Sequence, residues 1–544
     1  MRQSAAVLLA ACLAGCSTAY AGDWPGWRGP RRDGVAADSP ALVDAFDKDG
    51  PKKVWESEPI PGGHNGGFAQ PTVAAGKVFV FYNCRFDQPI ATRMLTRAVI
   101  DGLGWAPGIP EDLAKSIETA RLSPERAALK DAKEITPWVD AWVKANVTAE
   151  QRKFQAVAKR RLTLGAAALP LDKLAFVEPI VDKEFASEGD LDRWMVERGL
   201  AEPERKQIMA PITKTVRACS DHVFCLDRAK GRTEWKQDLT GNWMWYAASS
   251  TPVVAEGRCY VLGSGAVAYC LNAADGSVVW KSKPFGAAQH SHNRSSSVLL
   301  VDDKAVVSSD TALCALNAKT GETLWSNPQA VGKEASPIAW RAGDRTFILF
   351  LASGRTPDQG KLLCIDPADG KIVWSVVAGS TASTPVVAGD VAVFCSATKG
   401  IGLAAFRISA EGAKPLWNVP IIDWGTSPVV AGKYVYLVGG GNGTAGFGEA
   451  GKGRALCVEL ETGKIAWDEP LGPGAELSSP VLADGKLIAA VGPWLYLIKA
   501  SGDKYELLGK ANLGLAPWTS PALSDGFLFV RTNKGVACYD LRKQ

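Results

Sequence analysis

The chain has 544 residues, of which 47% are hydrophobic and 22% are charged, and its formal net charge at pH 7 is +4. These values are ordinary for a globular protein. So small a positive charge argues against nucleic acid or a strongly anionic surface as the partner.

The first 21 residues predict an export signal, in which one early Arg precedes an apolar stretch from Ala5 to Ala14. The stretch is too short to span a bilayer. Two processing routes stay open: ordinary cleavage after "AYA" (19–21), or cleavage at the lipobox-like "LAGC" (13–16), which would leave Cys16 lipidated. Both predict an exported protein, periplasmic or anchored at the outer envelope, whose only membrane contact is that lipid.

Residues 22–84 contain one isolated strand and the beginning of a repeat. "KKVWE" (52–56) carries Trp55, and no repeat precedes it. "PTVAAGKVFVFYNC" (71–84) predicts two strands, whose continuation "ACSDHVFCLDRAKGRTEW" begins only at residue 218.

The segment between them, 85–217, predicts a helical insertion in the loop that joins two strands. "SPERAALKDA" (123) and "TAEQRKFQAVAKRRL" (148) begin with capping residues and continue with good helix formers. Its expected small core consists of Trp138, Trp142, Leu162, Phe176, Leu191 and Trp194.

From residue 218 to 544 the chain repeats one module of four short strands. Most modules open with Ser/Thr-Pro, as in "STPVVAEGR" (250), and end with a D/N-x-x-x-G segment and a Trp, as in "LNAADGSVVW" (271); "SSSVLLVDDK" (295) is a looser opening, and the unit that starts at Pro480 has "YELL" in place of the Trp. Because this segment recurs, we interpret it as a turn in which Asp/Asn caps the backbone and Gly supplies positive φ, and not as a metal loop. The closing tryptophans are Trp235, Trp280, Trp325, Trp374, Trp417 and Trp467.

A period of 43 to 50 residues with four strands per unit is typical of a β-propeller blade. The last unit, which opens at "TSPALSDG" (519), ends before its fourth strand. We therefore expect residues 53–57, with Trp55, to complete it and close the ring. The predicted fold is an all-β, eight-bladed propeller of four antiparallel strands per blade, with a helical insertion in the first blade.

The segments "LNAKTGETLW", "VELETGKIAW" and "LDRAKGRTEW" resemble the Trp-docking repeat of the PQQ-repeat (quinoprotein alcohol dehydrogenase-like) propeller superfamily. "DWPGWRGPRRDGV" (23–35) is also similar to the N-terminal part of such proteins. The resemblance implies that each closing Trp, Trp55 included, docks between neighbouring blades. It covers about 400 residues, everything after the signal except the insertion.

Two branches of this superfamily imply different functions. The dehydrogenases bind PQQ with Ca²⁺, and many carry adjacent cysteines, but this chain has neither a Cys-Cys pair nor a CxxCH haem motif. No family metal ligand or catalytic Asp is assigned. We therefore expect no cofactor, no catalytic residue and no metal ligand, and favour a non-catalytic envelope scaffold for protein partners, similar to BamB-like propellers.

Ligands of propellers usually meet loops at one end of the channel. The loops that precede each blade's first strand should converge there. Their candidate binding residues are His64, Asn65, Trp243, Trp245, Tyr246, His290, His292, Arg294, Glu334, Asp423, Trp424 and Trp518.

This set leaves several alternatives open. The first is a polar channel lining or a protein-contact surface. The second is a site for a glycan or another small ligand, held by stacking and by Arg294. The third is a metal or PQQ site, in which His290, His292 and Glu334 would bind a metal ion. His222 lies outside the set, and we interpret it as structural.

The cysteines divide into two groups. Cys84 and Cys219 flank the insertion at equivalent hairpin positions and predict a disulfide, with two unpaired thiols as the alternative. Five others recur at one repeat position and are expected to be buried small residues, although Cys259 is expected to face Cys270 closely enough to bond.

Overall fold

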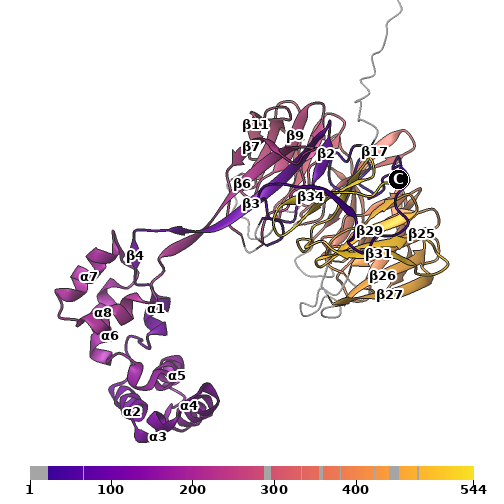
Figure 1. Cartoon of the computed structure of the whole chain (residues 1–544). Coiled ribbons are helices and arrows are strands. Elements are labelled where there is room, and N and C mark those ends of the chain that lie inside the picture. The colour runs from indigo at the N-terminus through magenta and orange to yellow at the C-terminus, as the bar shows by residue number, and fades with distance from the viewer. Residues whose placement is uncertain are drawn as a thin grey trace, which may run out of the picture. The chain divides into compact units, whose positions relative to one another are not determined.

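A computed structural model describes residues 22–64, 66–244, 246–286, 296–332, 334–353, 359–379, 381–421, 423–439, 452–473 and 477–544. The chain divides into two compact units: residues up to Arg85 together with Ala218–Gln544, and Phe86–Arg217. Figure 1 shows that the first unit is built of strands and that helices dominate the second. The predicted signal and Cys16 lie outside the described residues.

The described residues of the first unit form eight four-stranded antiparallel sheets, in agreement with a β-propeller. In order along the chain, the strands of the first four sheets are β2 (Thr72–Ala74), β3 (Lys77–Pro89), β6 (Thr215–Asp227), β7 (Thr233–Leu239); β8 (Val253–Ala255), β9 (Arg258–Leu262), β10 (Ala268–Asn272), β11 (Val278–Ser282); β12 (Leu299–Val301), β13 (Lys304–Ser308), β14 (Leu313–Asn317), β15 (Thr323–Asn327); and β16 (Ile338–Ala342), β17 (Arg345–Ala352), β18 (Lys361–Ile365), β19 (Ile372–Val377).

The strands of the other four sheets are β20 (Val386–Ala388), β21 (Val391–Cys395), β22 (Leu403–Ser409), β23 (Gly412–Val419); β24 (Val429–Ala431), β25 (Tyr434–Gly439), β26 (Lys452–Glu459), β27 (Ile465–Pro473); β28 (Val481–Ala483), β29 (Lys486–Val491), β30 (Trp494–Lys499), β31 (Leu507–Asn512); and β32 (Ala522–Ser524), β33 (Phe527–Arg531), β34 (Val536–Asp540) with β1 (Lys52–Glu56). The N-terminal strand β1 pairs antiparallel with β34, as expected, one residue earlier than predicted.

Each closing Trp joins its own sheet to the next one. Trp325 donates its indole N–H to the Pro367 carbonyl at 2.9 Å, and Trp55 donates to the Arg228 carbonyl at 2.8 Å, which links the last sheet to the first. The same bond is made by Trp235, Trp280, Trp374, Trp417 and Trp467. These seven bonds connect the sheets in chain order from the first to the seventh and the last sheet to the first; the seventh sheet has no closing Trp.

The small residue opposite each Trp follows from this docking. A β-bulge next to the Trp places it opposite Cys270 in the second sheet and opposite Ala315 in the third. The other recurring cysteines, Cys225, Cys364, Cys457 and Cys538, occupy the same position and are free and buried. They serve as small apolar residues beside an indole.

The seventh sheet has neither the small residue nor the closing Trp, and a side chain from another segment fills the space. Its bulge pairs Leu497 with Gly509, so a large residue stands where the others have Cys or Ala and a glycine stands where they have Trp. A Cβ on Gly509 would lie 2.7 Å from the ring of Phe46, which comes from the N-terminal segment. Phe46 thus occupies the space that a closing Trp takes in the other sheets.

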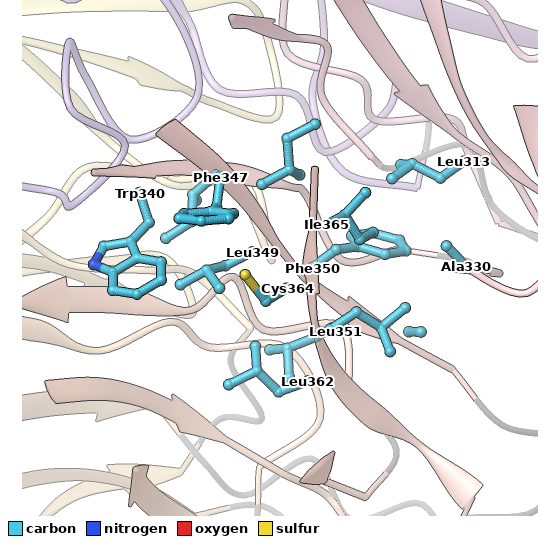
Figure 2. Packing of buried hydrophobic residues seen from close by; sticks show 14 of the residues in the cluster. Leu313, Ala330, Trp340, Phe347, Leu349, Phe350, Leu351, Leu362, Cys364 and Ile365 are labelled. Carbon is cyan, nitrogen blue, oxygen red and sulfur yellow. The ribbon is translucent and has the colours of Figure 1, made fainter. Parts of the chain in front are cut away.

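The core lies between neighbouring sheets. One buried cluster combines side chains from three consecutive sheets, with Leu313 from β14, Phe350 from β17 and Phe394 from β21. Figure 2 shows part of this cluster, in which Trp340, Phe347 and Leu349 come from β16 and β17.

The Ser/Thr that opens each repeat also joins neighbouring sheets. In six sheets its hydroxyl accepts a hydrogen bond from the backbone N–H at the same position of another sheet, for example Thr384 N–H to Ser427 Oγ at 2.8 Å. The equivalent bonds run from Gln70 to Thr251, from Thr251 to Ser297, from Ser297 to Ser336, from Ser427 to Ser479 and from Ser479 to Ser520. We call the six accepting Ser and Thr residues the hydroxyl ring. Their bonds hold the first strands of the sheets together.

In the second unit, the helices are α1 (Arg97–Gly102), α2 (Glu111–Arg121), α3 (Pro124–Ala128), α4 (Ala132–Asn146), α5 (Gln155–Leu164), α6 (Leu171–Val177), α7 (Glu188–Val196) and α8 (Glu202–Met209), with a short sheet of β4 (Arg93–Met94) and β5 (Glu184–Phe185). Ser123 caps α3, as its position suggests. Beyond Thr148, however, the α-helix begins only at Gln155, after a 3₁₀ turn at Arg152–Phe154.

This unit has two apolar clusters, one around Leu113, Val143 and Leu162 and the other around Leu174 and Leu191. Trp138 and Trp142 pack partly against the first cluster, and Trp194 against the second. The expectation for Phe176 was wrong: its side chain is 49% exposed. Leu174, two residues earlier on α6, is fully buried in its place.

The expected closeness of Cys259 and Cys270 was also wrong. Cys259 pairs with Leu271 and Cys270 with Tyr260. Neighbouring residues of a strand point to opposite faces, so the two cysteines lie in different apolar clusters.

Candidate functional site

Three of the loops predicted to share a rim carry aromatic side chains that contact one another. The ring of His64 lies 4.9 Å from that of Trp518 and 5.3 Å from that of Phe68. Tyr246 approaches Trp518 at 6.3 Å. We call these four residues the rim cluster; the first loop lies between β1 and β2, the second between β7 and β8, and the third between β31 and β32.

The backbone at Trp518 is strained. Its φ of +63° is left-handed, which costs a non-glycine residue about 1–2 kcal/mol. The loop is held there because Thr519 Oγ1 donates to the Ala516 carbonyl at 2.8 Å and the Ala516 N–H donates to the Arg531 carbonyl at 3.0 Å. Strain of this kind concentrates at functional sites, which singles out Trp518 within the rim cluster.

Arg85 lies beside the rim cluster. Its guanidinium donates to the Met244 carbonyl at 2.7 Å and lies 4.9 Å from the centre of the Trp243 ring. Burial, and secondarily the charge of Arg85, lowers the pKa of His64. The imidazole is therefore neutral near pH 7 and offers its ring face and one N–H to a ligand.

A buried carboxyl group anchors the loop that carries Tyr246. Asp221 accepts hydrogen bonds from Asn83 Nδ2 at 2.7 Å and from the Ser264 N–H at 2.6 Å. Asn83 in turn accepts from the N–H of Ala248 at 3.3 Å. Burial raises the pKa of Asp221 to about 6 against the opposing effect of these hydrogen bonds.

The other predicted rim residues lie elsewhere or cannot be placed. Asp423 is buried and caps its own loop, because its Oδ1 accepts from the N–H groups of Gly425 and Thr426. Trp424 lies in the loop before β24, where its carbonyl accepts from the N–H of Ala382 at 2.7 Å. Glu334 is half-buried in the loop before β16. The predicted residues outside the described part are Asn65, Trp245, His290, His292 and Arg294.

Cys84 and Cys219 are free, half-buried thiols. The Cys219 sulfur accepts from Asn83 Nδ2 at 3.4 Å and lies 3.7 Å from Ser264 Oγ, so it joins the network around Asp221. The disulfide stays a prediction.

Sequence reasoning missed Phe68, Arg85, Asn83 and Asp221. A signal existed for one of them, because a lone Asp in the apolar strand "ACSDHVFCLD" needs partners if it is buried. The other three have no local pattern that separates them from ordinary strand or loop residues.

His222 lies in a chain of three polar side chains on the first sheet. Its Nε2 is 2.8 Å from Ser220 Oγ and its Nδ1 is 2.7 Å from Asp238 Oδ1. The order Ser–His–Asp is that of serine hydrolases. However, the Asp238 side chain is 72% exposed and also pairs with Lys236, so we interpret the chain as a cross-strand network that stabilises β6 and β7.

The arrangement as a whole can stack a planar or sugar-like group on Trp518 and Tyr246, with Arg85 and His64 near it. In the described ranges, no group of three or more His, Cys, Asp or Glu side chains could hold a metal ion. None of the helices in the described part is long and apolar enough to cross a membrane.

Comparisons with known proteins agree with the repeat. Residues 220–469, a little under half of the chain, match the family model described as outer membrane protein assembly factor BamB. No curated protein matches the sequence.

Among solved structures, BamB from Moraxella catarrhalis is 16% identical with a TM-score of 0.45, over 58% of this chain and 88% of its own. Quinohemoprotein alcohol dehydrogenase from Comamonas testosteroni is 14% identical with a TM-score of 0.45, over 59% and 72%. The match over residues 220–469 is consistent with PQQ-like propeller repeats in that part of the chain.

Proposed function

We propose that the protein is an exported, closed eight-bladed propeller that acts as a non-catalytic interaction scaffold in the bacterial cell envelope and binds a protein partner through residues 86–217. The family description, an outer membrane assembly factor, supports an envelope role. The Trp bonds link the first seven sheets in order and the last sheet to the first, and the Ser479 N–H donates to Ser520 Oγ between the seventh and the eighth, which supports a closed ring.

The observation that carries the proposal is the second unit itself. It interrupts the hairpin between β3 and β6, yet the sheets pair, and their tryptophans dock, entirely within the first unit. Long insertions that the fold does not need are usually functional. This one has its own two apolar clusters and leaves three large apolar side chains exposed: Leu122 directly after α2, Phe176 on α6 and Val196 on α7.

Export belongs to the same proposal. The leader supports secretion by either processing route, and a lipidated Cys16 would hold the propeller at the membrane surface while both units face the solvent. We expect the partner to be a protein of the same compartment, and we expect neither PQQ nor a metal to be required.

Replacing Phe86–Arg217 by a four-residue Gly-Ser turn tests the proposal, because Arg85 and Ala218 lie on the adjacent strands β3 and β6. Both chains would be expressed in the native host, and the envelope would be solubilised mildly and resolved by size. The full chain should migrate in a complex of defined composition, and the shortened chain should migrate alone with an unchanged β-sheet circular dichroism spectrum. Retention of the complex by the shortened chain would contradict the proposal.

The rim cluster favours a second candidate function, a site for a small planar ligand or a glycan. If the ligand is PQQ with Ca²⁺, the protein would be a quinoprotein-type oxidoreductase. Addition of PQQ and Ca²⁺ to the purified chain, followed by absorbance and by dye-linked oxidation of simple alcohols, separates the two functions. Stoichiometric binding with turnover would replace the scaffold by an oxidoreductase; a substitution Trp518→Ala should then abolish binding.

A further inference from the structure

The N-terminal segment 24–36 crosses the first strands of several sheets. Trp24 forms a bridge with Val73, and Leu482 exchanges backbone hydrogen bonds with Gly34 and Ala36. The Trp27 indole N–H donates to Thr384 Oγ1 at 2.9 Å. The segment therefore contacts sheets that are far apart in the sequence, and it forms one wall of a cavity of about 530 Å³ together with β8, β12, β16 and β20.

Two arginines of this segment are buried without a carboxylate partner in the described part of the chain. Arg32 is 8% exposed and donates only to the carbonyls of Val298 and Ser297, at 2.6 and 3.1 Å. Arg28 is 1% exposed and donates to the carbonyls of Asp33 and Pro428. Each retains N–H groups that no described acceptor reaches: Nε of Arg32, and Nε and Nη1 of Arg28.

Burial lowers the pKa of Arg28 to about 10 and that of Arg32 to about 9. The charge of Arg28 contributes to the effect on Arg32, so the two guanidinium groups are close. Burying an ion is unfavourable unless an opposite charge lies near it. Arg32 thus places positive charge in the wall of the cavity, and no described carboxylate binds its guanidinium; Arg28 lies outside the lining, and the charge of Asp33 acts on it.

The cavity wall adds two further arginines and one aspartate. Arg31 pairs with Asp33 at 2.9 Å, and the second oxygen of Asp33 caps the N–H of Val35, so this carboxylate is already engaged. Arg341, at the end of β16, is exposed and makes no ion pair with a described residue; its Nε donates to the Gly343 carbonyl. The lining therefore has a net charge of +2, from three arginines (Arg31, Arg32 and Arg341) and one aspartate (Asp33).

The rest of the wall is apolar, with Trp27, Trp340, Val253 and Leu300 among its residues. A volume of this size is in the range of small-molecule sites and exceeds what a bare phosphate needs. Guanidinium groups bind phosphate and carboxylate oxygens with charge-assisted hydrogen bonds.

From this combination we propose that the cavity binds a small organic anion, whose phosphate or carboxylate group lies among Arg31, Arg32 and Arg341 and whose apolar part packs on the tryptophans. This site is separate from the rim cluster and from the second unit, and it does not depend on the scaffold function.

Isothermal titration of the full mature chain at fixed ionic strength tests the proposal with four probes: phenyl phosphate, benzoate, inorganic phosphate and the neutral benzyl alcohol. We expect phenyl phosphate or benzoate to bind with a stoichiometry of one, inorganic phosphate to bind more weakly, and benzyl alcohol not to bind. The stronger of the two aromatic anions identifies the acid group.

The matched variants are Arg341→Ala and Arg345→Ala. Both arginines are exposed and near the turn between β16 and β17, but Arg345 does not line the cavity and pairs with Asp366. Arg341→Ala should weaken binding of the aromatic anion at least tenfold, and Arg345→Ala should leave it within twofold. Because neither side chain is buried, both variants should fold, which a thermal unfolding curve checks.

Arg32→Gln tests the buried group, and its folded state is verified by the same curve before titration. If it folds, binding should be lost. Absence of binding for every anion, equal binding of benzyl alcohol, equal binding of inorganic and phenyl phosphate, or equal weakening by the two exposed variants would each overturn the proposal.

Discussion

At the scale of the residue, the recurring positions of this chain are explained by contacts with one indole. In five of the sheets the turn glycine lies directly against the Trp of the preceding sheet: a Cβ on Gly370 would be 2.5 Å from the Trp325 ring, and one on Gly276 would be 2.6 Å from that of Trp235. Both glycines also have positive φ. The glycine is thus required twice, by the turn and by the indole.

Two glycine substitutions separate these requirements. Gly370 and Gly343 both have positive φ, but nothing lies within 4 Å of a Cβ on Gly343. We expect Gly343→Ala to lower the free energy of unfolding by about 1–2 kcal/mol from backbone strain alone. Gly370→Ala should add about 1–3 kcal/mol from overpacking against Trp325. Urea unfolding measures both, and equal losses would show that the indole contact is not needed.

Asp221 should make stability depend on pH. Its pKa is about 6 in the folded chain and about 3.8 unfolded, so its favourable contribution is complete below pH 3.8 and is lost as the pH rises through 6. The free energy of unfolding of the wild type minus that of Asp221→Asn should therefore fall by about 3 kcal/mol between pH 3.5 and 7.

The control for this prediction is Asp238→Asn. Hydrogen bonds from Lys236 and His222 lower the pKa of Asp238, so the same difference should rise with pH. Urea unfolding at a series of pH values gives both curves. A flat curve for Asp221 would remove its role as a titrating anchor of the loop that carries Tyr246.

At the scale of the element, alternation and spacing predicted the strands well because each sheet repeats the same local pattern. The partners that complete the pattern come from distant segments and left no local signal. Phe46 replaces a Trp in the seventh sheet, Asn83 holds Asp221, and the hydroxyl ring gives the Ser/Thr-Pro openings a role between sheets. A periodic sequence shows which residues are equivalent but not which residues they contact.

In the candidate site, too, the sequence predicted which positions are equivalent but not every contact that they make. The common position of the loops predicted that His64, Tyr246 and Trp518 would lie near one another, as the structure places them. Asp423 belongs to an equivalent loop, but its carboxylate is buried and caps that loop by accepting from two backbone N–H groups, which loop position alone does not reveal.

In the helical unit, one carboxylate supports two buried arginines. Glu118 on α2 accepts from Arg121 and from Arg161 on α5, both at 2.6 Å. Burial raises the pKa of Glu118, and the two hydrogen bonds lower it and prevail. Its stabilising contribution is therefore present above pH 4.5 and is lost on acidification.

Glu118→Ala should destabilise the helical unit by about 3–5 kcal/mol, because it leaves two buried guanidinium groups with backbone carbonyls but without the carboxylate that balances their charge. Glu197→Ala, at an exposed position that pairs only loosely with Arg198, is the control and should cost under about 1 kcal/mol. Hydrogen exchange of α2 and α5 measures the effect within this unit. Unchanged exchange in Glu118→Ala would show that the arginines find other partners.

At the scale of the whole molecule, the sheets are held in order by the docked tryptophans on one side and by the hydroxyl ring near the first strands. The N-terminal segment and β1 add contacts to sheets at both ends of the sequence. Small changes in these connections should therefore affect the first unit as a whole.

Ser427→Ala tests this connection. It leaves the buried Thr384 N–H without its acceptor, which should lower the free energy of unfolding by about 1–3 kcal/mol. Ser39→Ala, at an exposed hydroxyl, should change it by less than about 0.5 kcal/mol. If the two variants are equally stable in thermal unfolding, the hydroxyl ring does not stabilise the assembly of sheets.

The central claim is that the helical unit binds a protein of the envelope. A photo-reactive amino acid placed at Leu122, Phe176 or Val196 in the living host tests it most directly, with Val377 as the control. Leu122 and Val377 are almost equally exposed, at 58% and 57%, but Val377 lies on β19 of the sheets. The account predicts one defined cross-linked protein from at least one of the three positions in the helical unit and none from Val377. Adducts of the same composition from both units, or from Val377 alone, would contradict it.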